Sequence, residues 1–469
     1  MNSCTQTWIL PPKGTLYFIG IGGIGMSALA RVFHHYGYTV KGSDKYDSQI
    51  IRELAAEGIE VTVGHSNKPH GVDIAVYSSA IDKQNEEYLW FKEQKVTFAH
   101  RGMLLAYLMN KTQSVAVTGT HGKTTTSSLI AFLAKETGLD PTALVGGYIR
   151  NYNSNVMLGR QDLIIAEVDE SDKSQLYYSP KINVITNLEA DHLDSYEDLN
   201  GLRAAFKTYF KNLKADAKVI YCADDHVLTE LVKAQERQSI SYGLNEHVDY
   251  CAKSIIYHQE STTFAVHKKG RFVDTITIPL TGEHNVLNTL ASCAALELLG
   301  ATLKDVFQAI VSFKGVKRRM EKLFEDKDLV VLDDYAHHPT EIKTVLTTLQ
   351  RKKRRIIAIF QPHRYTRTKH LLNEFKDAFH AADHLILTDI YSAGERAIEG
   401  VTIHTLAQAV RTVYPKPCEV IPLKEIGDHV LKIMAKGDII AFLGAGDITD
   451  VAGVFAERIR QQCRLVTTV

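Results

Sequence analysis

The sequence lacks the features that mark secreted, metal-scaffolded or nucleic-acid-binding proteins. Its 469 residues contain six cysteines with no CxxC pair, so neither a disulfide framework nor a zinc site built on paired cysteines is indicated. Such sparse cysteine use fits a reducing cytoplasm. An excess of charge is also absent, since 54 Lys and Arg balance 54 Asp and Glu. We therefore expect a cytoplasmic protein with neither nucleic acid nor a membrane as its partner.

Long apolar runs are missing as well. The most apolar early stretch, Leu16–Ala30, is broken by four glycines and is shorter than the ~20 residues that a membrane helix needs. Residues Met1–Gly14 lack the basic-then-apolar order of a signal peptide. The sequence thus predicts a soluble chain, and nothing in it indicates an oligomeric state.

The chain is too long for one hydrophobic core, because domains usually hold ~100–200 residues, and we expect three. Strand patterns alternate with helical patterns, which is typical of parallel sheets covered by helices. A more β-like stretch, Val248–Leu280, indicates a mixed sheet in the middle of the chain. We predict an α/β fold with domains at residues 1–112, 113–323 and 324–469.

Short apolar runs give the strand candidates, and apolar residues at helical spacing give the helices. The predicted strands are Leu16–Gly20, Tyr38–Gly42, Asp73–Ser78, Ser114–Thr118, Leu163–Val168, Asn183–Thr186, Leu329–Leu332, Ile356–Phe360, His384–Leu387 and Ile439–Phe442. The predicted helices are Ile24–Tyr36, Asn285–Leu299 and Leu303–Phe313.

The segment Gly119–Thr125 (GTHGKTT) lies between a predicted strand and a helix. Its glycines let backbone N–H groups face an anion, and the helix N-terminus adds a favourable dipole. In such a loop Lys123 reaches the outer phosphates of a nucleotide and Thr124 ligates Mg²⁺. The spacing departs from G-x-x-x-x-G-K-[ST], so the alternative is a glycine-rich helix start with a stray lysine. The combination of features favours a site for ATP with Mg²⁺.

Acidic segments follow two further strands of the same unit, at Glu167–Asp172 and Asn187–His192. Ligands bind at the carboxyl ends of the strands of an open parallel sheet, so these segments are expected to meet the phosphate loop. Mg²⁺ takes oxygen ligands, which favours Glu167 as the partner of Thr124, whereas His192 is a less natural ligand. Taken alone, each acidic run is more often a solvated loop or a helix cap.

A second glycine loop, Gly20–Gly25, lies between a strand and a helix, with Asp44 after the second strand. This pattern is similar to the dinucleotide fingerprint, in which glycines admit a diphosphate to the helix N-terminus and an acid binds a ribose. It indicates a diphosphate more reliably than NAD. Two nucleotide-type loops favour ATP on one and a nucleotide-tagged substrate on the other. The alternatives are a nicotinamide dehydrogenase and a non-catalytic ATP switch.

Two more segments carry polar side chains suited to a ligand. Asn285 and Asn288 open a helix, and an Asn amide can bond an adenine edge, although an ordinary helix start is the better explanation when these residues are taken alone. Charged residues at Lys317–Arg319 and Asp333–Pro339 span the predicted second boundary. They suit a cleft that closes on a ligand, and the alternative is a solvated linker.

Taken together, these residues resemble the Mur ligase family, the ATP-dependent enzymes of peptidoglycan precursor synthesis, over nearly the whole chain. The strings that carry the resemblance are GIGGIGMS at Gly20–Ser27, GTHGKTT at Gly119–Thr125, the acidic Glu167–Asp172, GEHN at Gly282–Asn285, DDYAHHPTE at Asp333–Glu341, QPHRYTRT at Gln361–Thr368 and YSAGE at Tyr391–Glu395. The first and the last three of these point to the alanine-adding branch.

The resemblance implies a reaction and an architecture. L-Alanine is joined to the carboxylate of UDP-N-acetylmuramate through an acyl phosphate, with ATP giving ADP and phosphate and with Mg²⁺ as cofactor, in the cytoplasm. The implied domains are a Rossmann-like UDP-sugar domain, a central P-loop ATPase-type domain with a mixed sheet, and a C-terminal Rossmann-like amino-acid domain. A sister branch that recycles a murein tripeptide is the nearest alternative.

The resemblance also implies roles for individual residues. Those implied to contact ATP are Gly119, Thr120, His121, Gly122, Lys123, Thr124, Thr125, Asn285, Asn288, Arg319 and Asp334. The implied Mg²⁺ ligands are Thr124, Glu167 and His192, and the implied catalytic set is Lys123, Glu167 and His192. The implied UDP-sugar residues are Gly22, Gly23, Ile24, Gly25, Met26, Ser27, Asp44, Ser78 and Ser79.

His363, Arg364 and Arg367 are implied to bind the amino acid. An arginine fork matches a carboxylate with two parallel bonds. The alternative is a pair of solvated arginines facing acids such as Glu374.

One position departs from the wider family. Several members carry a carbamylated lysine some fourteen residues after the histidine equivalent to His192. Here Phe206 stands at that place, with Lys207 beside it. We therefore assign no carbamyl-lysine bridge to a second Mg²⁺.

Overall fold

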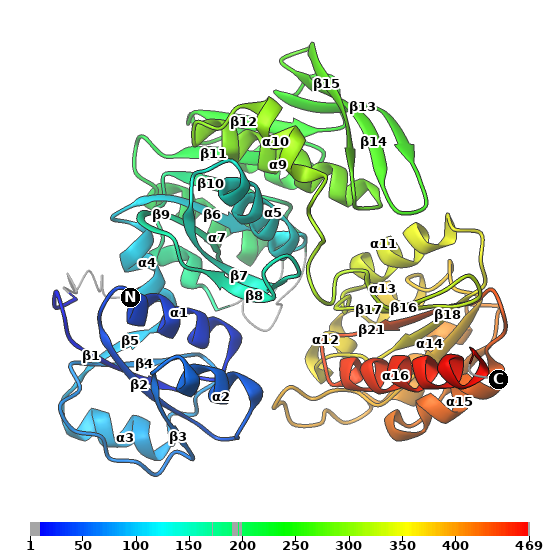
Figure 1. Cartoon of the computed structure of the whole chain (residues 1–469), viewed down its shortest axis with the longest axis horizontal. Helices are drawn as coiled ribbons and strands as arrows, with labels where there is room; N and C mark the ends of the chain where they lie inside the picture. Colours follow the sequence, from blue (N-terminus) through cyan, green and yellow to red (C-terminus); the bar gives the residue numbers. More distant parts are fainter. Residues whose placement is uncertain (1–9, 171, 190–195, 197–198, 468–469) are drawn as a thin grey trace.

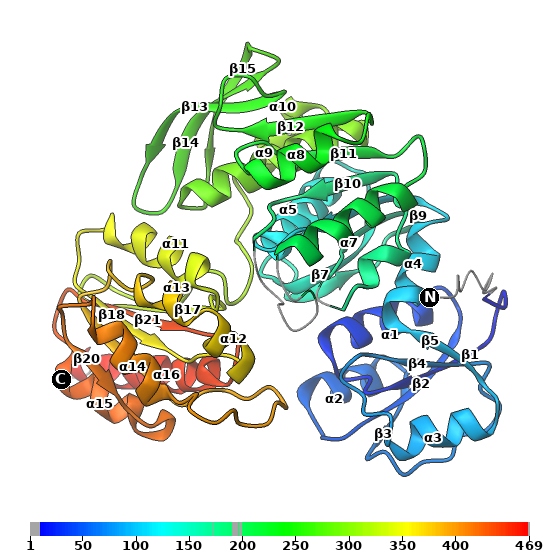
Figure 2. The same cartoon turned by 180° about the vertical axis from the view of Figure 1, so that it is seen from behind.

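Apolar strands flanked by helices build three separate sheets along the chain. The computed structural model describes residues 10–170, 172–189, 196 and 199–467. The three sheets and their helices lie along an arc, with the middle unit between the first and the third (Figures 1 and 2). The predicted α/β class is confirmed, with one sheet in each of three units.

The first sheet has five parallel strands in the order β3-β2-β1-β4-β5. The chain runs outward in opposite directions from β1, so the loops after β1 and β4 meet at a switch point, where open sheets accept ligands. Its strands are β1 (Thr15–Ile19), β2 (Thr39–Asp44), β3 (Glu60–Val63), β4 (Ile74–Tyr77) and β5 (Thr97–His100). Its helices are α1 (Ile24–His35), α2 (Gln49–Ala56), α3 (Glu86–Glu93) and α4 (Arg101–Met109).

The second sheet has ten strands in the order β15-β14-β13-β12-β11-β10-β6-β9-β7-β8. It is mixed, because β13 to β15 and the pair β7–β8 run antiparallel. Its strands are β6 (Gln113–Thr118), β7 (Pro141–Ile149), β8 (Ser154–Met157), β9 (Arg160–Glu167), β10 (Ile182–Ile185), β11 (Lys218–Cys222), β12 (Ser239–Gly243), β13 (Tyr250–Tyr257), β14 (Thr262–Lys268) and β15 (Arg271–Ile278). Its helices are α5 (Lys123–Glu136), η1 (Ser174–Tyr177), α7 (Leu199–Asn212), α8 (His226–Lys233), α9 (Glu283–Leu298) and α10 (Leu303–Ile310).

The third sheet has six strands in the order β16-β17-β21-β18-β19-β20, and only β16 pairs antiparallel. Its strands are β16 (Glu321–Glu325), β17 (Val330–Asp334), β18 (Ile356–Phe360), β19 (His384–Leu387), β20 (Cys418–Val420) and β21 (Ile439–Leu443). Its helices are α11 (Pro339–Gln350), α12 (Tyr365–His370), α13 (Leu372–Lys376), α14 (Ile403–Arg411), η2 (Leu423–Glu425), α15 (Ile426–Ile433) and α16 (Ile448–Thr467).

The predicted strands correspond to observed ones, but strands β3, β5, β7, β8, β11, β12, β16 and β20 were not predicted. Strands β16 and β20 are short and only half-buried, so their sequences carry polar side chains and lack an apolar run. Because β16 begins at Glu321, the predicted boundary at 323/324 falls within this strand. The three domain ranges otherwise stay a prediction.

The second and third units touch through charged and aromatic side chains beyond the linker that joins them. Glu260 forms ion pairs with both Lys322 and Lys352. The Arg351 guanidinium lies 3.7 Å from the centre of the Tyr257 ring. Within the described residues, every helix is too short or too polar to cross a membrane.

Candidate active site

The phosphate loop has the predicted order of strand, glycine turn and helix, with β6 before it and α5 after it. Gly119 has φ +120°, and a Cβ there would lie 2.8 Å from the backbone oxygen of Asn187 and would also collide with Thr186 Oγ1. Gly122, with φ +80°, precedes the first residue of α5. Glycine is therefore required at position 119 both by its backbone angle and by its contact with the chain after β10.

Lys123 is held beneath this loop by three oxygen atoms. Its Nζ donates to the backbone oxygens of Gly119 at 2.6 Å and Thr120 at 3.1 Å, and pairs with Glu170 Oε1 at 2.8 Å. Burial alone lowers the pKa of the Lys123 amine, but the charges of Glu170, Asp169 and Glu167 outweigh it and raise that pKa above its usual value. Lys123 therefore remains a cation. Sequence reasoning named the acidic segment but did not select Glu170.

The two oxygen atoms that are predicted to bind magnesium, one from Thr124 and one from Glu167, face one another beside the lysine. Thr124 Oγ1 donates to Glu167 Oε1 at 3.2 Å, and the other carboxylate oxygen accepts the Gly146 N–H at 2.9 Å. Parallel pairing of β6 with β9 brings the two segments together. His192, the third predicted ligand, lies outside the described residues.

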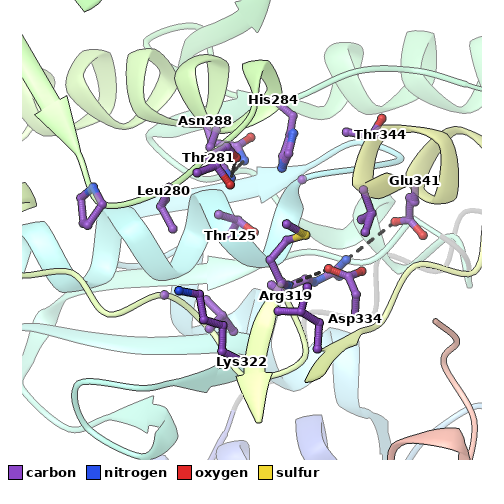
Figure 3. A pocket seen from close by; sticks show the side chains of 18 of the residues that line it. Thr125, Leu280, Thr281, His284, Asn288, Arg319, Lys322, Asp334, Glu341 and Thr344 are labelled. Atoms are coloured by element: carbon purple, nitrogen blue, oxygen red, sulfur yellow. Dashed lines mark hydrogen bonds and ion pairs between the residues drawn. The ribbon is translucent and has the colours of Figure 1, made fainter. Parts of the chain in front are cut away.

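A cavity of about 770 Å³ opens between the second and third units (Figure 3). Asn285 and Asn288 lie on one side of it, where the Asn288 amide donates to Asn285 Oδ1 at 3.2 Å and the Asn285 amide donates to the Thr281 oxygen at 2.8 Å. These bonds fix the orientation of both amides. The predicted ATP residues that line this cavity are His121, Gly122, Thr125, Asn285, Asn288, Arg319 and Asp334.

Asp334 lies on the opposite wall, at the start of the third unit (Figure 3). Its carboxylate accepts the backbone N–H groups of Met320 at 2.7 Å and Ala336 at 2.8 Å. Burial raises its pKa to about 6, although Arg319 and these N–H groups lower it. Asp334 thus fixes the turn that presents Arg319 to the cavity.

A second cavity, of about 650 Å³, is lined by all three units. Ile24 and Ser79 come from the switch point of the first sheet, and the second unit contributes the phosphate loop and Glu167. The third unit contributes His363, Arg364 and Arg367. The tertiary structure therefore brings residues predicted for three different ligands to one space.

The other residues implied to bind the UDP-sugar do not line either of these two cavities. They are Gly22, Gly23, Gly25, Met26, Ser27, Asp44 and Ser78. Asp44 Oδ2 accepts the Gly22 N–H at 2.8 Å, so this carboxylate fixes the loop. The side chains of Met26 and Ser27 are buried in α1. Gly23 precedes the first residue of α1, and Ser78 follows β4.

The residues that the resemblance implies to bind the amino acid, His363, Arg364 and Arg367, follow β18 and form a compact group. The His363 ring stacks on Tyr391 with ring centres 5.6 Å apart, and Arg367 NH1 lies 3.2 Å from His363 Nδ1. Arg367 is 9% exposed, which contradicts the alternative of a solvated arginine. Arg364 pairs at 3.8 Å with Glu395, not with Glu374.

His121 links the second and third units through charge. Its ring nitrogens lie 3.5 Å from Glu189 Oε2 and 3.2 Å from Glu341 Oε1, and the ring centre of His338 is 4.7 Å away. Burial lowers the pKa of His121, but the hydrogen bonds and charges of the two glutamates raise it to about 9. For Glu189, burial is outweighed by His121 and Thr340, which lower its pKa to about 2. Sequence reasoning assigned no role to either glutamate.

Three family models match consecutive parts of the chain. "Mur ligase family, catalytic domain" matches residues 15–113, "Mur ligase middle domain" residues 117–296 and "Mur ligase, glutamate ligase domain" residues 318–446. A UDP-N-acetylmuramate–L-alanine ligase of Syntrophotalea carbinolica is 38% identical and covers 96% of this chain and 98% of its own. A protein of the same name from Anaeromyxobacter is 40% identical and covers 92% and 95%.

Several solved structures are similar to this chain over most of its length. The UDP-N-acetylmuramate–alanine ligase of Thermotoga maritima has a TM-score of 0.80 and 29% identity, and covers 96% of this chain and 100% of its own. A murein peptide ligase of Psychrobacter arcticus has a TM-score of 0.68 and 23% identity, with 94% and 98% covered. The MurF ligase of T. maritima in complex with ADP has a TM-score of 0.64 at 18% identity, with 85% and 97% covered. The last two support the fold alone.

We predict that His121→Asn destabilises the protein in a pH-dependent manner. The folded-state pKa of about 9 lies above the ordinary 6.5, so the contribution is full below pH 6.5 and is lost as pH rises through 9. A shift of this size corresponds to roughly 3 kcal/mol at most. Thermal unfolding of wild type and variant at pH 6 and pH 9.5 should give a large difference at the lower pH and a small one at the higher. A difference that is equal at both pH values contradicts the prediction, and exposed His404→Asn is the control.

Proposed function

The chain belongs to the Mur ligase family, and from this premise we propose that it joins L-alanine to the carboxylate of UDP-N-acetylmuramate, with ATP giving ADP and phosphate. One observation carries the proposal: the cavity of about 650 Å³ that the phosphate loop, the switch point of the first sheet and the Arg364–Arg367 segment share. Such a ligase must bring a nucleotide, a sugar carboxylate and an amino acid to one place. The reaction is a cytoplasmic step of peptidoglycan precursor synthesis.

ATP is matched by the second and third units together, and each of the other two substrates by one unit. ATP lies across the larger cavity, with its adenine at Asn285 and Asn288 and its phosphates on Gly119–Thr125. The UDP-sugar lies on the first unit, with its diphosphate at the glycine loop. The carboxylate of L-alanine lies against Arg364 and Arg367.

The reaction proceeds in two steps because a carboxylate is a poor electrophile. A carboxylate oxygen of the sugar first attacks the γ-phosphorus, and the bond to ADP breaks. The alanine amine then attacks the acyl carbon, inorganic phosphate leaves, and the amine loses a proton. Lys123 holds its positive charge against the transferred phosphoryl group, and closure of the units excludes water from the acyl phosphate.

Thr124 and Glu167 fit Mg²⁺, since their oxygen atoms lie 3.2 Å apart beside Lys123 and hard cations prefer oxygen ligands. When bound, this cation neutralises phosphoryl charge. His192 completes the proposed set.

Two rival functions explain less. A nicotinamide dehydrogenase leaves the phosphate loop and the arginine pair without a role, and an ATP switch needs no amino-acid site. The nearer alternative, a ligase that adds a murein tripeptide, takes a longer substrate than L-alanine. The mass of the product distinguishes it from the proposed function. Phosphate release measured against a panel of UDP-sugars and amino acids, with product mass, tests the proposal. Release that does not depend on both UDP-N-acetylmuramate and L-alanine would refute it.

We predict that Lys123→Ala lowers kcat ~10³-fold or more, because it removes a cation from developing phosphoryl charge. The change also deprives buried Glu170 of its ion pair, so a loss of stability must be separated from a loss of catalysis. The double variant Lys123→Ala/Glu170→Gln removes the buried charge as well, and should recover stability without recovering activity. A rate above about a tenth of wild type in either variant at saturating ATP contradicts this role.

We predict that Gly23→Val raises KM for UDP-N-acetylmuramate strongly and leaves KM for ATP nearly unchanged. A Cβ at Gly23 meets protein atoms only at 3.6 Å or more, so the fold accepts it, whereas a diphosphate approaching the backbone does not. Gly453→Val in α16, where a Cβ meets nothing within 4 Å, is the control and should leave both values unchanged. An effect on ATP alone would move the sugar nucleotide elsewhere.

We predict that Arg367→Lys raises KM for L-alanine ~10- to 150-fold, since one charged hydrogen bond is lost and lysine cannot copy the planar fork. KM for ATP should stay nearly the same. Arg396→Lys, an exposed arginine outside the cavity, is the control. An alanine KM within about twofold of wild type for both Arg364→Lys and Arg367→Lys places the amino acid at the His337–His338 segment instead.

A further inference from the structure

Two histidines and a glutamate meet in the third unit, away from the active site. His384 begins β19, Glu419 lies in the edge strand β20 and His429 lies in α15. His384 Nε2 is 2.6 Å from Glu419 Oε1, and His429 Nε2 is 3.3 Å from Glu419 Oε2. One ligand atom from each residue lies within 4.8 Å of the other two.

The group lies near the opposite ends of the strands from the substrate-binding residues that are proposed for the third unit. His363, Arg364 and Asp334 lie at the carboxyl end of β18 or β17, whereas His384 is the first residue of a parallel strand. In a parallel sheet all the strands start on one side of the sheet and end on the opposite side, so first and last residues lie far apart. The group is therefore independent of the ATP and amino-acid sites.

The fold explains why these three side chains converge. Glu419 pairs with Ile386, and alternate residues of a strand face the same side, so Glu419, Ile386 and His384 share one face. That face packs against α15 through Ile426 and Val430. His429 lies three residues after Ile426 and so projects from the same side of the helix.

The second observation concerns the imidazole nitrogen of His429. Its Nε2 is buried and makes no hydrogen bond within the described part of the chain, although a carboxylate oxygen lies 3.3 Å away. Buried polar atoms are normally satisfied, so a nitrogen aimed at a carboxylate without bonding to it suits a shared third partner. Glu419 is 38% exposed on its side chain, which leaves a path from solvent.

We propose that His384, Glu419 and His429 bind a divalent transition-metal ion, with Zn²⁺ as the representative case. Two imidazole nitrogens and one carboxylate form a set typical of zinc, with water in the fourth position. Mg²⁺ prefers an all-oxygen site, so this ion is distinct from the cation proposed beside Lys123. The ion ties the edge strand β20 to β19 and α15.

The test is Zn²⁺ titration of the full chain after chelator treatment, by calorimetry in excess Mg²⁺, with Co²⁺ absorption as a second readout of four-coordinate geometry. Wild type should bind one Zn²⁺ at this site and gain thermal stability. Glu419→Gln and His429→Gln should each weaken binding by more than about 100-fold, since even outer partners of metal ligands are worth 10- to 100-fold. Either variant suffices if the other fails to fold.

Two controls separate this site from others. Exposed His404→Gln should bind as wild type does. His338→Gln should also leave the affinity unchanged, because its group with His121 and Glu189 is the other set of candidate ligands in the described residues. Zn²⁺ binding that is lost in His338→Gln and kept in Glu419→Gln overturns the proposal. Failure of wild type to bind Zn²⁺ also overturns the proposal. The group would then be explained as a hydrogen-bonded contact between β19 and β20.

Discussion

The close approach of the Gly119 backbone to the chain after β10 is the constraint on which the active site depends. It leaves no room for a side chain and requires a backbone angle that glycine adopts easily. The turn that results points the carbonyl oxygens of Gly119 and Thr120 at Lys123 and starts α5 at that lysine. Lys123, Thr124 and Glu167 themselves do not have a positive φ.

Buried charge is the second organising feature, and it is balanced locally. The amine of Lys123 faces Glu170, and the imidazole of His121 lies between Glu189 and Glu341. Unpaired buried charges are costly, so each of these pairs constrains the segments that carry it. The His121 group joins two units, and this couples the loop Gly119–Thr125 to the helix α11 of the third unit. In the proposed function, a nucleotide between the units meets charged groups whose positions are already set.

The three sheets supply one edge each to a common space. In the first sheet the order of strands reverses at β1, and in the second β6 lies between β10 and β9, so the loops that follow these strands converge. The third sheet contributes the segment after β18. The group around Glu419 lies away from this common space.

The sequence by itself determined the α/β class, the order of three units and the strand, loop and helix around Lys123. These features depend on residues close together in the chain, where apolar periodicity and glycine act locally. Motif reasoning named Thr124, Glu167 and Asn285, and the resemblance added Arg319 and Arg367. The tertiary structure places these five residues around two cavities. Only the tertiary structure decided that Glu170 pairs with Lys123, that Glu341 contacts His121 across 220 residues, and that Arg364 faces Glu395. It also decided the edge strands β16 and β20 and the meeting of His384 with His429. Contacts of this kind join segments distant in sequence, and local patterns carry no record of which distant segment packing will bring near.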